Sequence, residues 1–473
     1  MRFTVVGHST VFVESEDRRL IVDPWLFGSC YWRSWWHYPP VESVDDAWLD
    51  VDYVYLTHHH FDHFHYPSLR RIDKRATVFI PRFGVDFMAG ELRDLGFTSI
   101  EEMDHGVTFP LAGSLEITSY QAGFDDSALI VKDNTAVLAD FNDAKIRGSA
   151  LGQILKKHGS PTFLLKNHSW AQSYPHCYTS PDPADLELIN RDEKVAVFLH
   201  AVREAKPAFA IPFASNVCFL HPQTLQYNDT AITPFDVAAA FAEDDTLDAE
   251  LVIMGPGDQW SAEHGFDVTD QSDFFTNRES HIERMAAAVE PQIAKSLHDE
   301  AELTLDYDTF KTHFETFLQA LPPLASRILS KPVIFEVPSQ TPSYWVLDFS
   351  TRRVTRSAVL PAVYASVILI DEGLLSDAID KNIVYLVSIS MRVSVALSAG
   401  GVGVDLMFWA FLAMWELGYL PLRTSFDART LGVAWRRRRE FTDGLLPKLI
   451  GKGALVERMA SNLKPDHVDA SGS

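Results

Sequence analysis

Alternating and continuous hydrophobic runs divide the first third of the chain into short strands and helices. Residues 3–14 and 19–22 are strand-like and are separated by the polar turn Ser15-Glu16-Asp17-Arg18, so they predict a hairpin. Residues 51–56 predict a buried strand, and Tyr66-Pro67-Ser68 predicts a helix start because proline is favoured in the first helical turn. Further patterns predict strands at 77–80, 114–119, 128–131 and 136–140, and helices at 85–95 and 144–157. Interleaved strands and helices indicate an α/β fold.

The pattern changes in the second half of the chain. Residues 185–206 predict a long helix, followed by a short strand at 208–212 and an unusually apolar loop at 213–222. The stretch 236–321 is acidic and helix-prone, whereas residues 332–358 return to strand alternation and lead into apolar helices. We therefore expect two domains, residues 1–325 and 326–473, and a C-terminal α+β architecture.

Two segments near the C-terminus need separate interpretation. The apolar window 402–420 contains Asp405 and Glu416 and is followed by Pro421, which favours a buried helix over a membrane span. Residues 464–473 are expected to form a frayed tail.

Charge and cysteine content narrow the class of protein. The 473 residues carry a formal net charge of −23, so nucleic acid and anionic membranes are not expected partners. The run Arg436–Arg439 is either a solvated helix face or a dock for an acidic partner or a phosphate. The three cysteines form no closely spaced pair, and residues 1–6 begin a strand-like pattern without signal-peptide features. A cytoplasmic protein is expected.

Six consecutive residues carry the strongest chemical signal. The run His58-His59-His60-Phe61-Asp62-His63 follows the predicted strand 51–56 and precedes the predicted helix. At such a turn, imidazole and carboxylate ligands can diverge toward two metal ions a few Å apart. We expect His58 and His60 to bind one ion, and Asp62 and His63 the other. His59 and His65 are expected to support these ligands or to be exposed.

A dense aromatic segment precedes the cluster and predicts a cover for the site. Residues 25–38 would be unfavourable in water, so they either pack on the core or cover a bulky apolar substrate. The substrate-binding candidates in this segment are Trp32, Trp35, Trp36 and Tyr38. The helices around residues 406–415 either extend this pocket or form an ordinary core.

His168 is a further candidate ligand. It follows an apolar strand at 162–165 and could reach the same sheet edge, although a structural histidine explains it nearly as well. His176 allows the same two interpretations, and His8 favours a structural or supporting role.

The order of these motifs resembles the metallo-β-lactamase superfamily. Gly7-His8-Ser9-Thr10, then Asp23-Pro24 and then the histidine cluster match that superfamily in the first third of the chain. The resemblance implies an αββα sandwich with a dinuclear metal centre. It also implies a bridging aspartate at a strand end, for which Asp143 is the first candidate and Asp140 the second.

The chain departs from this pattern at two positions. The superfamily's middle histidine is replaced by a segment that offers Gln121, Asp125 and Asp126. The late histidine is absent from residues 211–215, although His221 follows in the same region. These departures disfavour ordinary zinc β-lactamase or glyoxalase chemistry. A carboxylate in place of an imidazole moves the site toward iron, although zinc and manganese tolerate the same donors.

Three segments are similar to a narrower group. Residues 60–69, 174–178 and 212–222 resemble the catalytic domains of CMP-N-acetylneuraminate hydroxylases and bacterial natural-product diiron hydroxylases, over roughly residues 1–225. The resemblance implies a non-haem diiron monooxygenase that uses two iron ions and O2 on a bulky or carrier-linked substrate, such as an acyl-CoA or a nucleotide-linked compound. The chain has no Rieske pattern of Cys and His, so an external reductase or ferredoxin is implied.

Two other functions remain open from sequence. A metal-bridging hydroxide in the same centre could hydrolyse an ester, thioester or phosphodiester, with zinc or manganese as the metal. A ligand- or metal-binding protein without catalysis is the third interpretation, because two superfamily histidines are missing. Dependence on O2 and a reductant separates the first function from the other two.

Overall fold

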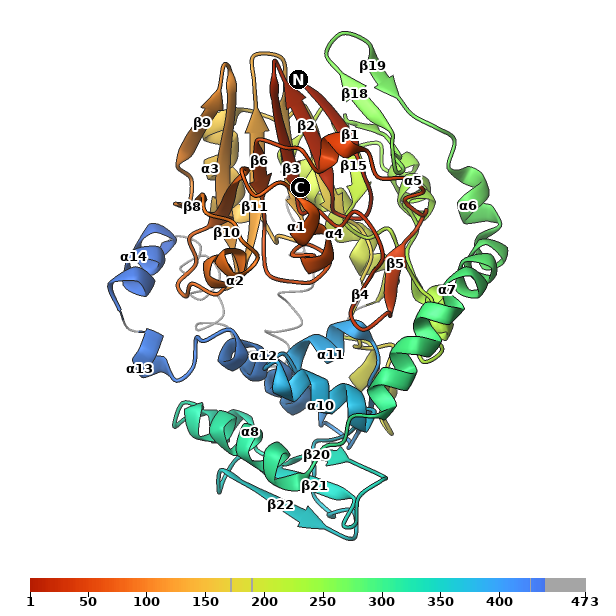
Figure 1. Cartoon of the computed structure of the whole chain (residues 1–473), viewed down its shortest axis with the longest axis vertical. Helices are drawn as coiled ribbons and strands as arrows, with labels where there is room; N and C mark the ends of the chain where they lie inside the picture. Colours follow the sequence, from red (N-terminus) through yellow and green to blue (C-terminus); the bar gives the residue numbers. More distant parts are fainter. Residues whose placement is uncertain (171, 189, 426, 439–473) are drawn as a thin grey trace, which may run out of the picture.

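Two β-sheets packed face to face form the upper part of the protein as it is drawn in Figure 1. The structure is a computed structural model that describes residues 1–170, 172–188, 190–425 and 427–438. The first sheet has the order β19 (Gly265–Asp267), β18 (Gln259–Ser261), β1 (Arg2–Val5), β2 (Val11–Ser15), β3 (Arg18–Val22), β6 (Tyr53–Tyr55), β7 (Thr77–Pro81) and β8 (Ile100–Met103). The second has the order β17 (Glu250–Leu251), β15 (Phe209–Phe213), β13 (Phe163–Asn167), β12 (Val137–Asn142), β11 (Asp126–Lys132), β10 (Leu115–Ala122) and β9 (Thr108–Ala112).

Helices cover the outer face of each sheet. Phe3 and Val13 of the first sheet share a buried cluster with Leu129 and Leu165 of the second, so the two inner faces form one core. On the outside of the first sheet pack α1 (Tyr66–Arg71) and α2 (Met88–Asp94). On the outside of the second pack α3 (Gly148–His158), α4 (Arg191–Ala205) and α5 (Pro234–Ala242). This arrangement confirms the αββα sandwich expected from the sequence.

Parallel strand pairs place several chain segments at one end of the sandwich. In the first sheet β3, β6 and β7 run parallel, and in the second β12, β13 and β15 do so. The loops that follow these strands therefore leave from the same edges of the two facing sheets. Asp23, the histidine cluster, Asp143 and His168 all belong to these loops.

A third, mixed sheet lies at the other end of the molecule (Figure 1). Its order is β14 (Tyr178–Thr179), β24 (Ser394–Leu397), β23 (Ser366–Leu369), β20 (Val333–Glu336), β21 (Tyr344–Asp348) and β22 (Arg353–Ser357). Its core includes residues of α8 (Tyr307–Ala320), α10 (Glu372–Asp380), α11 (Tyr385–Ser390) and α12 (Val402–Glu416). The predicted boundary near residue 325 stays a prediction, and α8 and β14, which precede it, belong to this assembly.

The remaining elements connect or flank these layers. They are β4 (Ser29–Cys30), β5 (Trp35–His37), β16 (Val217–Phe219), α6 (Ser272–Thr276), α7 (Arg278–Ala301), α9 (Ala325–Ile328), α13 (Leu422–Ser425) and α14 (Ala428–Arg436). The long helix α7 runs along one side of the molecule (Figure 1).

Several predicted elements differ from the observed ones. The run 3–14 is two antiparallel strands, β1 and β2, because the chain turns at residues 7–10. Gly7 is required there, since a Cβ atom would lie 2.8 Å from the His37 ring. The helix expected at 185–206 begins only at Arg191, because Asn190 caps its first turn. The apolar loop 213–222 contains β16, which pairs with β5.

The sequence pattern also missed five short strands of the second half. Strands β17, β18 and β19 interrupt the stretch expected to be helical, and β23 and β24 lie among the predicted apolar helices. Each has two to four residues, which is too short for a period-2 pattern to be distinguished from a helical one.

The window 402–420 forms the buried helix α12, as expected. Among the described residues, no helix has the length and apolar character needed to cross a membrane. Asp405 of this helix is fully buried and accepts a 2.7 Å hydrogen bond from the Tyr178 hydroxyl. Burial raises the pKa of Asp405 from its usual value to about 6, although hydrogen bonds from Ser366 and Tyr178 oppose the shift.

We expect the substitution Asp405→Asn to stabilise the protein above pH 6. A carboxyl whose pKa is raised on folding binds its proton more tightly in the folded state, so stability falls as the pH rises from about 4 to about 6. Asparagine can still accept the Tyr178 hydrogen bond but has no charge to bury. A shift of about two pKa units corresponds to about 3 kcal/mol, the upper limit of the expected gain in unfolding free energy at pH 7.5.

Urea denaturation of both proteins at pH 7.5 and at pH 4.5 tests this expectation. The stability difference should shrink at the lower pH, where the folded wild type has a protonated Asp405. An equal difference at both pH values would show that the ionisation of Asp405 has no part in it.

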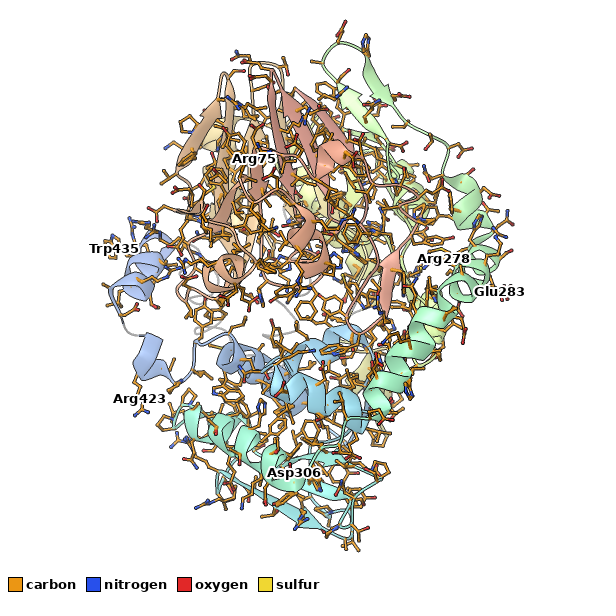
Figure 2. All side chains as sticks on the ribbon, viewed as in Figure 1. Arg75, Arg278, Glu283, Asp306, Arg423 and Trp435 are labelled. Atoms are coloured by element: carbon orange, nitrogen blue, oxygen red, sulfur yellow. The ribbon has the colours of Figure 1, made fainter. Side chains whose placement is uncertain are left out.

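The arginine run at the end of the described chain has several environments. Arg436 forms an ion pair with Asp104, and Arg437 is buried and donates a 2.6 Å hydrogen bond to the Gly123 carbonyl. Arg438 lies over the ring of Trp435, which is 69% exposed and stands at the surface in Figure 2. Arg439 and the predicted tail at 464–473 lie outside the described residues. The described arginines therefore do not form one uniformly solvated face.

Candidate metal centre

The histidine cluster occupies the turn between β6 and α1. Residues 53–55 pair with β3 on one side and β7 on the other, so the turn starts from the middle of the first sheet. Asp23, which follows β3, accepts hydrogen bonds from the Thr57 backbone N–H at 2.7 Å and from its hydroxyl at 2.6 Å. His65 precedes α1 as its N-cap, and Pro67 lies in the first helical turn. These contacts fix both ends of the cluster.

One group of possible ligands lies between the two sheets. His58, His63 and Asp143 each offer an atom within 4.8 Å of the others. The distance from His63 Nε2 to Asp143 Oδ2 is 3.6 Å, and His58 Nε2 lies 2.9 Å from His60 Nδ1. Asp126 lies beside this group without belonging to it: its Oδ1 is 3.4 Å from His58 Nδ1, the ring nitrogen on the side away from His60.

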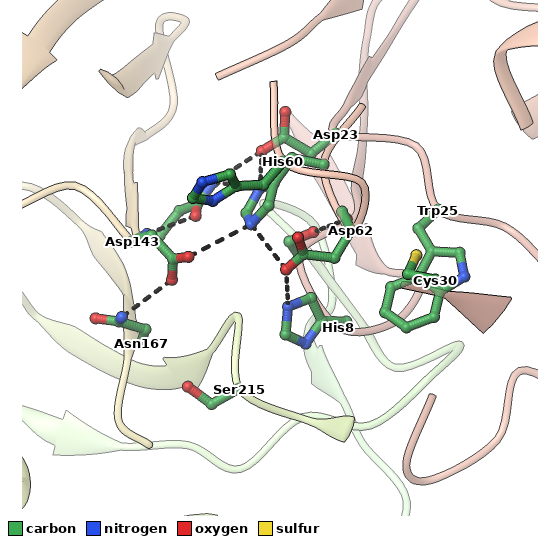
Figure 3. A network of polar contacts seen from close by, with 12 residues as sticks. His8, Asp23, Trp25, Cys30, His60, Asp62, Asp143, Asn167 and Ser215 are labelled. Atoms are coloured by element: carbon green, nitrogen blue, oxygen red, sulfur yellow. Dashed lines mark hydrogen bonds and ion pairs between the residues drawn. The ribbon is translucent and has the colours of Figure 1, made fainter. Parts of the chain in front are cut away.

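A second group shares His63 with the first. His8, Asp62 and His63 also offer ligand atoms within 4.8 Å of one another. Asp62 Oδ2 lies 3.0 Å from His8 Nε2 and 3.3 Å from His63 Nε2. Figure 3 shows His8 on one side of Asp62, with Asp143 across the site. His8 follows β1 and thus approaches the cluster from a different strand.

Hydrogen bonds hold each side chain of the two groups in place. The Tyr31 hydroxyl donates to Asp62 Oδ1 at 2.5 Å, which leaves Asp62 Oδ2 toward His8 and His63. Asn167 Nδ2 donates to Asp143 Oδ1 at 3.0 Å. Asp23 Oδ2 lies 2.7 Å from His63 Nδ1, so this imidazole can present Nε2 to the site. A carboxylate behind a histidine is the usual way in which a metal-ligating ring is oriented.

The electrostatics of the two groups suit a cation. Burial, together with the neighbouring histidines, lowers the pKa of His58, so its imidazole is neutral and can donate a lone pair. Burial and the charge of Asp143 raise the pKa of Asp126. Burial alone would lower the pKa of His63, but the carboxylates of Asp62 and Asp23 hold it well above its usual value.

These residues fit a metal ion. His63 Nε2 is fully buried and has no hydrogen-bond partner among the described residues, although two carboxylate oxygens lie within 4 Å of it. A bound cation would satisfy this nitrogen and compensate the buried carboxylates around it. The mixture of imidazole and carboxylate donors is suitable for iron, zinc or manganese.

A cavity of about 270 Å³ opens next to the two groups. One part of its wall is formed by the candidate ligands His8, His58, His60, Asp62, Asp126 and Asp143. The rest is formed by aromatic, aliphatic, polar, acidic and basic residues: Tyr31, Trp35, Asp125, Lys145, Asn167, Ser169, Trp170, Gln172, Lys194, Ala214, Ser215 and Ile389. Ile389 belongs to α11, so the C-terminal region contributes to this wall.

Two predicted ligands lie outside both groups. His168 is buried, and neither of its ring nitrogens has a hydrogen-bond partner among the described residues. It does not line the cavity and is not a member of either ligand group. Burial lowers the pKa of His168 to about 3. His221 is likewise buried, its Nδ1 accepts the Gln223 backbone N–H at 3.3 Å, and it is also absent from these groups.

The alternatives left open in sequence are placed differently. Asp125 and Asp126 line the cavity, whereas the Gln121 amide donates to the Met103 carbonyl at 3.2 Å. The His176 ring lies 4.9 Å from the Trp170 ring. Asp140 is fully buried, but neither of its oxygens forms a hydrogen bond to a described residue.

The two other histidines of the cluster segment have partners of their own. His59 Nε2 lies 2.8 Å from Glu91 of α2, and His65 Nδ1 lies 2.7 Å from Ser68 of α1. Neither belongs to a ligand group found among the described residues.

The aromatic segment 25–38 is packed more deeply than a free lid would be. Trp35 lines the cavity, while Trp36 and Tyr38 are buried in a cluster with Ile282 and Ile293 of α7. Trp32 Nε1 donates to Asp377 of α10 at 2.7 Å. Of the four predicted substrate-binding residues, only Trp35 reaches the cavity that lies beside the ligand groups. Pairing of β5 with β16 holds the segment closed.

Sequence reasoning missed four residues of this site. Asp23 was recognised only as part of a motif, although its position at the end of a parallel strand next to β6 was a usable signal. Tyr31 was assigned to the aromatic segment without a role of its own. Lys145 and Lys194 had no sequence signal, because the cavity joins a loop and a helix far apart in the chain.

Comparisons with known proteins agree with this architecture. Residues 2–162 match the family model described as a beta-lactamase superfamily domain. A protein of Mycolicibacterium smegmatis named as a Rieske 2Fe-2S iron-sulfur protein is 30% identical over 250 residues, which is 50% of this chain and 48% of the relative. The cytidine monophosphate-N-acetylneuraminic acid hydroxylase of Danio rerio is 36% identical over 242 residues, which is 48% of this chain and 40% of the relative.

The chain spans about half the length of the curated relatives it matches. Among solved structures, CmlA, a diiron beta-hydroxylase from Streptomyces venezuelae, is 18% identical with a TM-score of 0.34, covering 45% of this chain and 44% of that one. This score is too low to support an inference. The family match and the hydroxylase relatives show that the chain contains a metallo-β-lactamase-fold domain and is homologous, over about half its length, to the cytidine monophosphate-N-acetylneuraminic acid hydroxylases.

Proposed function

We propose that this chain is a non-haem diiron monooxygenase that hydroxylates a bulky small-molecule or carrier-linked substrate with O2 and external electrons. The observation that carries the proposal is the pair of ligand groups that share His63 and combine imidazoles with carboxylates. Donor sets of this mixed kind are suitable for iron. The hydroxylase names of the relatives support the same reaction class.

We assign seven residues to the two ions. His58 and His60 would bind the first ion. Asp126, which lines the same cavity, would take the place of the superfamily's middle histidine. Asp62 and His63 would bind the second, with His8 in place of the late histidine. Asp143, which lies with His58 and His63, would be the aspartate that the resemblance predicts for this centre. His168 and His221 remain predicted ligands that would need to move toward the site.

The chain's own residues prepare the site for this chemistry. Asp23 and Tyr31 orient His63 and Asp62, and Trp35 with Trp170 gives the cavity apolar walls that exclude water from the substrate. When bound, the two irons would supply the activation of O2 with two electrons from outside the chain. The hydrogen bond from Trp32 to Asp377 holds segment 25–38 to the C-terminal region, which helps to fix Tyr31 and Trp35 in the cavity wall.

An iron–sulfur protein is the electron donor that we propose. The three cysteines are free and buried, and they lie in separate parts of the fold, so they offer no cluster site among the described residues. The name of the Mycolicibacterium smegmatis relative refers to a Rieske centre, the kind of one-electron carrier such a reaction needs. A reducing cytoplasm is the compartment that suits these thiols.

Metal content and oxygen consumption test the proposal together. Protein purified without added metal is analysed for metals, its absorption spectrum is recorded, and O2 uptake is followed with a chemical reductant. About two irons per chain and reductant-dependent O2 uptake are expected. About two zincs, no colour and no O2 uptake would instead favour the hydrolase of an ester, thioester or phosphodiester.

A further inference from the structure

The cavity beside the candidate metal centre has a basic side. Lys145, in the loop after β12, and Lys194, in the first turns of α4, both line its wall. The candidate ligands form another part of the same wall, so a molecule in the cavity would contact both. The chain as a whole is acidic, with 41 lysines and arginines against 64 aspartates and glutamates.

Neither ammonium group has a partner in the described ranges. The side-chain ammonium groups of Lys145 and Lys194 form no hydrogen bond, and no carboxylate of residues 1–170, 172–188, 190–425 or 427–438 forms an ion pair with them within 4.0 Å. Lys166, the third lysine of this region, differs because its Nζ donates to the Asn142 carbonyl at 3.0 Å. Lys166 therefore ties β13 to β12, whereas the other two lysines remain available to a ligand.

Lys145 and Lys194 line the same cavity as the carboxylates of Asp125, Asp126 and Asp143. Two like charges on one cavity wall are unfavourable alone, and an anion between them would remove that repulsion. Of the carboxylates in this lining, Asp126 and Asp143 are groups that the proposed metal ions would use, and Asp125 is assigned to no ion.

We propose that Lys145 and Lys194 form a subsite for one oxyanionic group of the substrate, a carboxylate or a phosphate. The substrate is then an acidic small molecule whose anion is held by the lysines while its body lies against Trp35 and Trp170, within reach of the metal centre. The anion is part of the substrate only if the proposed function holds. The binding itself needs neither iron nor O2.

Calorimetric titration of the metal-loaded chain with three small aromatic compounds tests the subsite. Benzoate and phenyl phosphate share an apolar ring and differ in their anion, and benzyl alcohol has the ring without a charge. We expect both anions to bind more tightly than benzyl alcohol. The substitutions Lys145→Met and Lys194→Met should each weaken anion binding about tenfold or more, because each removes a charged hydrogen-bond donor from the subsite. Whichever of phenyl phosphate and benzoate binds more tightly would show whether the subsite prefers a phosphate or a carboxylate.

Two matched variants and the metal content complete the experiment. Lys156 is exposed on α3 away from the cavity wall, so Lys156→Met should bind the anions like the wild type. Lys194→Arg keeps the charge and should retain most of the affinity. All variants are compared at equal metal content, which separates anion binding from loss of metal. Equal anion affinity in the wild type and both cavity methionine variants, or no preference of the wild type for anions over benzyl alcohol, would overturn the proposal, whatever metal or reaction the protein proves to have.

Discussion

Replacement of Asp143 with asparagine is expected to remove most of the metal from this protein. Asp143 is an assigned ligand that directly follows strand β12 of the second sheet. Its Oδ2 lies 3.6 Å from His63 Nε2. An amide has the same shape but no charge, so it is a weaker metal ligand than a carboxylate. Loss of a group that only orients a metal ligand lowers metal affinity by about 10–100-fold. Because Asp143 is assigned as a ligand itself, we expect its replacement to lower metal affinity by about 100-fold or more and to abolish O2 uptake.

The matched control for this variant is Asp140→Asn. Asp140 lies three residues earlier on the same strand and was the second candidate for the bridging position. It lines no part of the cavity, and burial raises its pKa well above the usual value, so asparagine should be tolerated there. Elemental analysis of both variants after identical purification decides between them. Retention of about two ions by Asp143→Asn, with loss from Asp140→Asn, would reverse the assignment.

The parts of this structure that follow from local patterns could be predicted from sequence. The position of the histidine cluster at a strand-to-helix turn could be predicted, because the pattern of residues 51–56 indicates a buried strand and Pro67 indicates the start of a helix. Periodicity indicated only an interleaved α/β fold. The αββα order came from the resemblance to the metallo-β-lactamase superfamily, and the two facing sheets with helices outside confirm it. The identity of the second sheet's contribution, Asp143, came from the resemblance and not from periodicity.

Contacts between distant segments could not be predicted in the same way. The aromatic segment 25–38 was expected to pack on the core or to cover substrate, and its residues do different things: Trp35 faces the cavity, whereas Trp36 packs with α7. Apolar character alone cannot separate these roles, because both surfaces exclude water. Lys145 and Lys194 show the same limit, since their neighbourhood depends on how α4 crosses the second sheet.

The strand predicted at residues 3–14 was wrong because the hydrophobic pattern does not indicate the turn within it. Residues 3–14 look like one continuous strand, but the chain reverses at Gly7-His8-Ser9-Thr10, where the Val6 backbone N–H donates to the Thr10 carbonyl at 2.9 Å. This reversal aims His8 at Asp62, which is 54 residues away in the sequence. A histidine expected to be structural thus became a member of a ligand group only when the turn was known.

The role of His8 decides how the chain compensates for its missing late histidine. If His8 binds the second ion, the substitution His8→Gln should lower the metal content from about two ions to about one, because the second ion would lose one of its few assigned ligands while the first keeps its own. Cobalt(II) titration followed by absorption would resolve the two sites, since their ligand sets differ. The reference variant is His59→Gln, in which the lost contact is to Glu91 and both ions should remain.

Two ions bound with unchanged affinity in His8→Gln would mean that His8 only hydrogen-bonds Asp62, and the second ion would then need His168, His221 or solvent to complete its coordination. Because neither of these histidines lies in a ligand group of the described structure, that outcome would also imply a rearrangement of the loops after β13 and β16 when metal binds.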